Sequence, residues 1–169
     1  MIRRSMLVMV LFIGCAPELD SRTQVETPEG MVVARITVAQ LASLHWIEGT
    51  WRAESEDTAS FVQRYRFKDD STLLVETYGD ASKPGGADST YFALRDGWFG
   101  TRGDGERWAA TQLSARNVTF IPVANTQQTI VWEYKSPEAW VGRITTPEME
   151  GRPARDESFE MHRIATRSP

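Results

Sequence analysis

The chain has 169 residues, of which 41% are hydrophobic and 10% aromatic, and it carries a formal net charge of −4. This length and apolar content suffice for one domain with its own hydrophobic core. The modest acidic balance, without a basic stripe, argues against nucleic acid as a partner and against charge-driven attachment to anionic lipid. A lone cysteine, Cys15, leaves no pair for a disulfide, so the domain has to be stabilised by its core.

The first residues of the chain are basic and the next are apolar. Arg3 and Arg4 precede an apolar run of nine residues, Met6 to Gly14, and Cys15 follows directly. The run is about half of the ~18 residues that a transmembrane helix needs, so residues 1–14 are predicted to be a signal peptide that is removed. Leu-Phe-Ile-Gly-Cys resembles the lipobox of bacterial lipoproteins, which implies that Cys15 is acylated and becomes the first residue of the mature chain.

An ordinary secretory signal is the alternative. Such a signal favours small residues at positions −1 and −3, whereas Phe12 stands at −3 here. More than one acyl chain on Cys15 would give stable anchoring, and Ala16 in second place resembles outer-membrane lipoproteins. We therefore expect a lipid-anchored protein of the bacterial envelope, at the periplasmic face of the outer membrane. Loss of Arg3 and Arg4, with all 23 acidic residues retained, would change the net charge from −4 to −6.

Two short segments precede the predicted strands. From Ala16 to about Val33 the chain is polar, aperiodic and broken by prolines, which predicts a flexible tether over residues 15–35. Thr37-Val-Ala-Gln40 is a capping-box pattern that predicts a short helix to about Leu44. One side of this helix would present Val38, Leu41 and Leu44.

From Trp46 onward the apolar residues recur with a period of two, which is typical of strands. The alternating runs are four to nine residues long and are bounded by turn residues such as Asp96-Gly97 and Ser136-Pro137. Strands with short connections and no helix between them imply an antiparallel meander, and closure would remove its exposed edges. The predicted fold over residues 36–165 is an all-β, antiparallel up-and-down barrel of 8–10 strands, with a β-sandwich as the alternative.

The first predicted strand opens with the motif Leu44-His-Trp46-Ile-Glu-Gly49-Thr-Trp51-Arg52. A short helix leading into Gly-x-Trp at the head of a β-meander resembles the calycin superfamily, the lipocalins and their relatives. More narrowly, the motif is similar to the opening of a family of small bacterial lipocalin-like proteins, and the resemblance covers Leu41 to Ile164. The chain departs from that family at Gln63-Arg-Tyr65 and at Asn125-Thr-Gln-Gln128, so a shared site built on those residues would be absent here.

The resemblance implies how one end of the barrel is closed. In lipocalin-like barrels the first-strand Trp plugs the closed end, and an Arg from the last strand stacks over it. Trp51 and Arg163 are the corresponding pair, and Arg143 is the alternative partner of Trp51. A desolvated cation–π contact is worth about 1 kcal/mol or more. Gly49, Trp51 and Arg163 are therefore predicted to have a structural role.

Residues with catalytic or metal-binding chemistry are few. Zinc sites usually take three or four Cys, His or carboxylate ligands, and the domain has two histidines, His45 and His162, with no cysteine besides Cys15. No Gly-x-Ser-x-Gly elbow supports a Ser-His-Asp triad. A haem ligated by His162, as in the nitrobindin branch of the calycins, is an alternative to a surface histidine. We predict no catalytic residue, no metal and no cofactor, and an enzyme is the least favoured function.

One group of residues suggests a ligand site. If the strands alternate as assigned, four aromatic residues and one carboxylate share faces with large apolar residues. Eight-stranded barrels either fill their interior or hold one small ligand, and aromatic residues with a few polar groups line such pockets. We expect a small apolar ligand in the barrel, or alternatively a filled barrel with a structural or protein-interaction role. The candidate ligand-binding residues are Glu76, Tyr78, Trp132, Tyr134 and Trp140.

Overall fold

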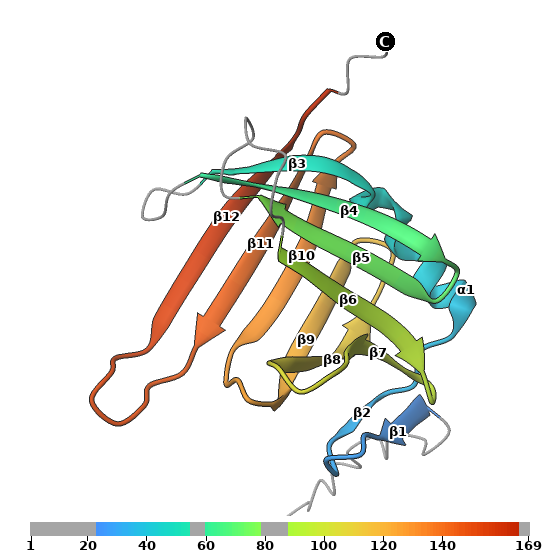
Figure 1. The fold of residues 1–169 in the computed structure, drawn as a ribbon, viewed down its shortest axis with the longest axis vertical. Helices are drawn as coiled ribbons and strands as arrows, with labels where there is room; N and C mark the ends of the chain where they lie inside the picture. The colour runs from blue at the N-terminus through green and yellow to red at the C-terminus, as the bar shows by residue number, and fades with distance from the viewer. Residues whose placement is uncertain (1–22, 55–59, 79–87, 166–169) are drawn as a thin grey trace, which may run out of the picture.

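The computed structural model describes residues 23–54, 60–78 and 88–165, so Cys15 and the predicted signal peptide lie outside the described residues. Ten antiparallel strands form a closed barrel in which neighbours in sequence pair with each other and the last strand pairs with the first (Figure 1). The prediction of an all-β up-and-down barrel with a short helix is confirmed, and the β-sandwich alternative is wrong. The barrel strands are β3 (Gly49–Glu54), β4 (Phe61–Asp69), β5 (Thr72–Tyr78), β6 (Asp88–Arg95), β7 (Trp98–Thr101), β8 (Arg107–Leu113), β9 (Asn117–Ala124), β10 (Thr129–Ser136), β11 (Ala139–Thr146) and β12 (Arg155–Arg163).

Alternation along each strand separates the interior of the barrel from its surface. In β12, Phe159 and Met161 are buried, whereas Glu160 between them is exposed. The same period of two places Trp132 of β10 and Trp140 of β11 in the core. Because closure turns one face of every strand inward, these residues form one core along the barrel axis.

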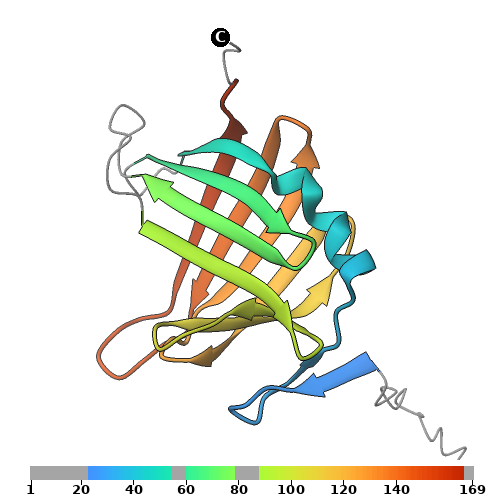
Figure 2. The ribbon, with the colours of Figure 1, turned by 45° about the vertical axis from the view of Figure 1, so that its right-hand side comes forward.

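The two ends of the barrel differ in their connections. At one end, here called the closed end, tight turns join the strands and the N-terminal helical segment lies across them (Figure 2). In the β6–β7 turn Asp96 and Gly97 have φ of 53° and 82°, as a two-residue hairpin of type I′ requires. In the β4–β5 turn the amide and hydroxyl of Ser71 donate to Asp69 Oδ1 at 2.8 Å, which lowers the pKa of that carboxyl. The opposite end, the open end, carries the connection 147–154.

The helix begins at the predicted capping box. In α1 (Val38–Leu41), Thr37 Oγ1 accepts from the Gln40 amide at 3.2 Å, and Gln40 Oε1 accepts from the Thr37 amide at 2.9 Å. Both bonds satisfy amides that have no partner inside the helix. The four residues Thr37 to Gln40 therefore suffice to predict where the helix begins.

The helix ends earlier than predicted. A 3-10 helix, η2 (Ala42–Ile47), continues from α1, so the first barrel strand starts at Gly49 and not at Leu44. Leu41 and Leu44 are fully buried as expected, but Val38, at the first position of the helix, is 48% exposed. Among the described residues, no helix is both long enough and apolar enough to cross a bilayer.

The segment before the helix contains an ordered hairpin. β1 (Gln24–Glu26) and β2 (Val32–Ala34) pair with each other and lie on the outside of the barrel (Figure 1). Val33 is 2% exposed and packs with Trp98 and Ala109 of β7 and β8. The expected flexible tether therefore does not extend over residues 24–34, because Val33 and Val25 pack against apolar side chains on the outer face of the barrel.

Candidate functional site

The closed end of the barrel is plugged by Trp51 and Arg163. Trp51 is fully buried in β3, and its Nε1 donates to the Ile47 carbonyl at 2.7 Å. The guanidinium carbon of Arg163 lies 4.1 Å from the centroid of the Trp51 ring, within the range of a cation–π contact. Arg143 instead donates to Glu133 Oε2 at 2.7 Å. The stacked arginine is thus Arg163 of the last strand.

Backbone carbonyls hold the Arg163 guanidinium in place. Its Nε donates to Pro137 O at 2.7 Å, and its Nη1 and Nη2 donate to Glu48 O at 2.9 Å and Trp46 O at 3.3 Å. Gly49 makes room for this group: its φ is +133°, and a Cβ at this position would lie 2.4 Å from Arg163 Nη1. A side chain at residue 49 would therefore both strain the backbone and displace the guanidinium.

Aromatic rings fill the barrel next to this plug. Trp46 meets Tyr134 and Trp140 edge to face at centroid distances of 5.5 Å and 6.2 Å. Trp140 also meets Trp51 at 6.2 Å and Tyr65 at 5.5 Å. Edge-to-face contacts at these distances are favourable beyond the area they bury. Tyr134, a candidate ligand residue, therefore packs with the closed end.

A cavity of about 300 Å³ lies in the other half of the barrel. Tyr65, Trp132 and Trp140 form its floor, since these rings also pack on one another and on the aromatic residues of the closed end. The volume is at the lower limit of small-molecule pockets, which span roughly 300–1,000 Å³. The lining residues are Phe61, Gln63, Tyr65, Val75, Thr77, Thr90, Phe92, Trp108, Ile130, Trp132, Trp140, Gly142, Arg143, Ile144, Phe159 and Met161.

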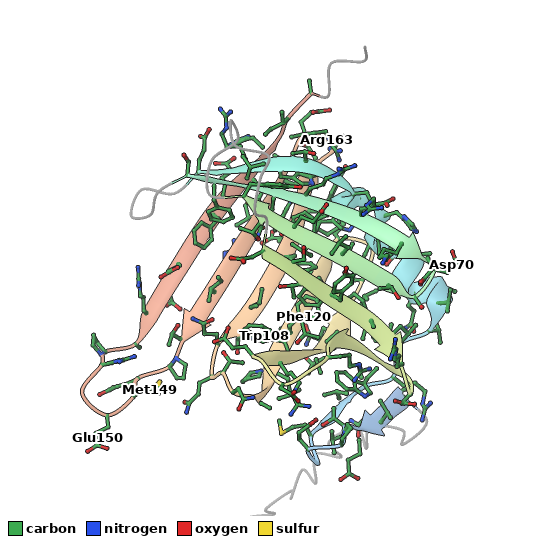
Figure 3. The ribbon with its side chains drawn as sticks, in the orientation of Figure 1. Asp70, Trp108, Phe120, Met149, Glu150 and Arg163 are labelled. Carbon is green, nitrogen blue, oxygen red and sulfur yellow. The ribbon has the colours of Figure 1, made fainter. Side chains whose placement is uncertain are left out.

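Trp108 of β8 forms one side of the cavity. Its side chain is 9% exposed, and its Nε1 donates to the carbonyl of Gln128 at 2.8 Å. Figure 3 shows Trp108 and Phe120 within the barrel, and Met149 and Glu150 in the loop beyond its open end. The hydrogen bond fixes the indole ring to the connection between β9 and β10.

Three polar side chains form a chain of hydrogen bonds on one wall of the cavity. Tyr65 Oη donates to Gln63 Oε1 at 2.6 Å, and Gln63 Nε2 donates to Thr77 Oγ1 at 3.0 Å. Burial raises the pKa of the Tyr65 phenol, so this group is neutral at physiological pH. A few neutral polar groups on an otherwise apolar surface are what orients a ligand in a small-molecule pocket.

Arg143 is the one charged residue among the described residues that line the cavity. Its Nη1 donates to Glu133 Oε2 at 2.7 Å, and Lys135 donates to the other oxygen of the same carboxylate. The hydrogen bonds from Lys135 and Arg143 lower the pKa of Glu133 and keep the carboxylate ionised. The charge of Arg143 is therefore paired with a neighbouring side chain of the barrel wall.

The five candidate ligand residues are not all brought to the cavity. Trp132 and Trp140 line it. Glu76 and Tyr78 do not, because they alternate along β5 with Thr77, which does. Side chains of a strand alternate between its two faces, so an error of one residue in the predicted alternation exchanges the inward and outward residues. This explains why Thr77, and not Glu76 or Tyr78, lines the cavity.

Gln63 and Tyr65 of β4 are among the cavity residues that the sequence prediction does not include. The signal for them is present in the alternation of β4, where Phe61 and Tyr65 lie on the same face as Gln63. The hydrogen bond from Gln63 to Thr77 depends on the register between β4 and β5, in which these two residues lie opposite each other. No local pattern specifies that register.

The two histidines lie outside the cavity. His45 Nδ1 is 2.8 Å from Glu48 Oε2 at the surface, and His162 is partly exposed on the outer face of β12, 3.7 Å from Glu160. Within the described part of the chain, no group of three or more His, Cys, Asp or Glu residues is arranged to hold a metal ion. His162 does not reach the cavity, as the haem alternative would require.

Comparisons with known proteins were made for the sequence and for the fold. No protein-family model matches the chain, and no curated protein matches it. Among solved structures, the chain is similar to a redesigned β-barrel with 13% sequence identity, over 71% of this chain and 93% of that chain. The TM-score is 0.36, at which the similarity carries no conclusion about family or function.

Proposed function

We propose that the protein binds a small, largely apolar ligand in the cavity of its barrel, while lipid on Cys15 anchors it to the bacterial envelope. The observation that carries the ligand proposal is the cavity of about 300 Å³, lined mainly by apolar and aromatic side chains. Concave, mostly apolar sites with a few convergent polar groups are the usual form of small-molecule pockets.

A filled barrel with a structural or protein-interaction role is the alternative. It accounts for the closed half, where Trp51, Phe99 and Phe120 are fully buried. It does not account for the open half, where Gln63 and Thr77 line unfilled space. The observations therefore favour ligand binding.

Kinship with lipocalin-like proteins is a further part of the proposal. It is supported by the Gly49-Thr-Trp51 motif at the start of β3 and by the short helix that precedes it. The stacking of Arg163, from the last strand, over Trp51 agrees with what that resemblance implies.

Lipid anchoring is tested by the substitution Cys15→Ser. The variant should move from the membrane fraction to the soluble fraction while its melting temperature is unchanged, because the barrel strands are formed by residues 49–163. Retention of the variant in the membrane fraction would contradict the proposal. Full-length protein with Cys15 intact is the control.

Ligand binding is tested by native mass spectrometry of protein recovered from the envelope. The wild type should carry a co-purified small molecule. Ile144→Trp, which places a large ring in the cavity, should lose that molecule. Val141→Trp, on the outer face of the same strand, should retain it. Retention by both variants would place the molecule outside the cavity and contradict the proposal.

A further inference from the structure

The polar groups of the cavity are gathered on adjacent strands. Gln63 and Tyr65 come from β4, Thr77 from β5 and Thr90 from β6. The wall opposite them is apolar and comes from β10, β11 and β12, with Ile130, Ile144, Phe159 and Met161. A ligand in this cavity therefore meets hydrogen-bonding groups on one side only.

On β4 and β5, the hydrogen bonds within this wall leave two donors without a partner among the described residues. Gln63 Oε1 accepts from Tyr65, and one N–H of Gln63 Nε2 donates to Thr77 Oγ1. A primary amide has a second N–H, and the threonine hydroxyl has its own proton. No described residue accepts from either group. Donors left unpaired in a partly buried site cost free energy, which an acceptor on the ligand would recover.

The charges around the cavity do not favour an ionic ligand. Arg143 is paired with Glu133. Further along the inward face of β12, Arg155 Nε lies 2.7 Å from Glu157 Oε1 in an ion pair, so these two charges also neutralise each other. Asp88 is exposed at the rim and lies opposite Thr77 in the β5–β6 register. A carboxylate in the cavity would lose its hydration without gaining an unpaired cation.

We infer that the ligand is uncharged and presents a hydrogen-bond acceptor, such as a ketone or ester carbonyl, to the Gln63 amide and the Thr77 hydroxyl. This inference rests on the proposed function, since it names the class of ligand that the same cavity takes. The apolar remainder of the ligand would lie against the wall that carries Ile130, Ile144 and Phe159.

Matched probes test the inference on the Cys15→Ser chain, which carries no acyl group of its own. N-phenyl-1-naphthylamine, an uncharged fluorophore, reports occupancy of the cavity. Competitors of one skeleton then displace it: 2-acetylnaphthalene with a carbonyl, 2-ethylnaphthalene without one, and 2-naphthoate with a carboxylate. The ketone should bind about three- to tenfold more tightly than the hydrocarbon, as expected for one net hydrogen bond. The carboxylate should bind at least about tenfold more weakly than the ketone.

Two variants test whether the polar wall causes the preference for the ketone over the hydrocarbon. Gln63→Leu removes the amide, and Thr77→Val removes the hydroxyl at nearly constant volume. Each variant should still bind the fluorophore but should lose most of the preference for the ketone over the hydrocarbon. Gln112→Leu makes the same chemical change at an exposed position of β8 and should keep the wild-type preference. Thr77→Val decides the question if Gln63→Leu does not fold.

The outcomes separate the inference from the proposed function. A wild type that does not bind the fluorophore or any competitor overturns both. Binding of the fluorophore with equal affinity for the three competitors overturns the inference and leaves the proposed function standing. Retention of the ketone preference in both Gln63→Leu and Thr77→Val also overturns the inference, because the preference then comes from other residues.

Discussion

The two halves of the barrel are built on the same ten strands, yet one half is filled and the other is hollow. In the closed half the inward positions carry large rings, and the 3-10 helix adds Leu44 and Ile47, both fully buried. In the open half the inward positions include Gln63, Thr77 and Gly142. The volume of the inward side chains, rather than the number of strands, therefore decides where this barrel has space for a ligand.

The largest expected effect is the difference in stability between a substitution in the closed half and one in the open half. Trp51→Ala removes a fully buried ring with its hydrogen bond and its cation–π contact. It should lower the free energy of unfolding by about 3–5 kcal/mol. Phe61→Ala, at a partly exposed position of the cavity wall, should cost less than half as much. Chemical denaturation measures both, and equal losses would mean that the closed half is not the more tightly packed one.

A smaller effect is expected from substituting two glycines with positive φ, one at each end of the barrel. Gly49→Ala brings a methyl group against the Arg163 guanidinium, whereas Gly103, with φ of +103°, has no atom within 4 Å of the added Cβ. Both substitutions strain the backbone, so their difference isolates the collision. Gly49→Ala should cost about 2 kcal/mol more than Gly103→Ala in chemical denaturation. If the two variants lose the same free energy of unfolding, Arg163 is not fixed against residue 49.

The smallest effect appears at alkaline pH and concerns the floor of the cavity. Burial raises the pKa of Tyr65 above the ordinary value of 10.0, so the stability that depends on its neutral phenol is complete below pH 10 and is lost as the pH rises beyond it. From pH 10 to 11 the wild type should lose up to about 1.4 kcal/mol more than Tyr65→Phe. Tyr91→Phe, at an exposed site, is the control. Identical pH profiles for wild type and Tyr65→Phe would mean that Tyr65 is accessible to water.

Local patterns in the sequence predict the features of the fold that have local causes. The period of two predicts the barrel strands, Asp96-Gly97 predicts the tight β6–β7 turn, and Thr37 with Gln40 predicts the start of the helix. Each of these depends on residues within one or two turns of chain. They account for the strand order as well, because short connections leave neighbouring strands adjacent.

Features that depend on contacts between distant residues are not predictable in this way. Leu73, Leu74 and Val75 are all buried, so the local pattern of β5 does not tell which face is inward, and the predicted residues Glu76 and Tyr78 do not line the cavity. The β1–β2 hairpin has strands of three residues and is stabilised by Trp98, far away in the sequence. The polar wall of the cavity likewise depends on the register between strands.

Fluorescence titration with N-phenyl-1-naphthylamine tests most directly whether the open half is a ligand cavity. Wild type and Val141→Trp should bind the fluorophore with the same affinity, because residue 141 lies on the outer face of β11. Ile144→Trp should bind it at least about tenfold more weakly while keeping its melting temperature, because its ring occupies the cavity. Undiminished binding by a folded Ile144→Trp protein would contradict the presence of a ligand site inside the barrel.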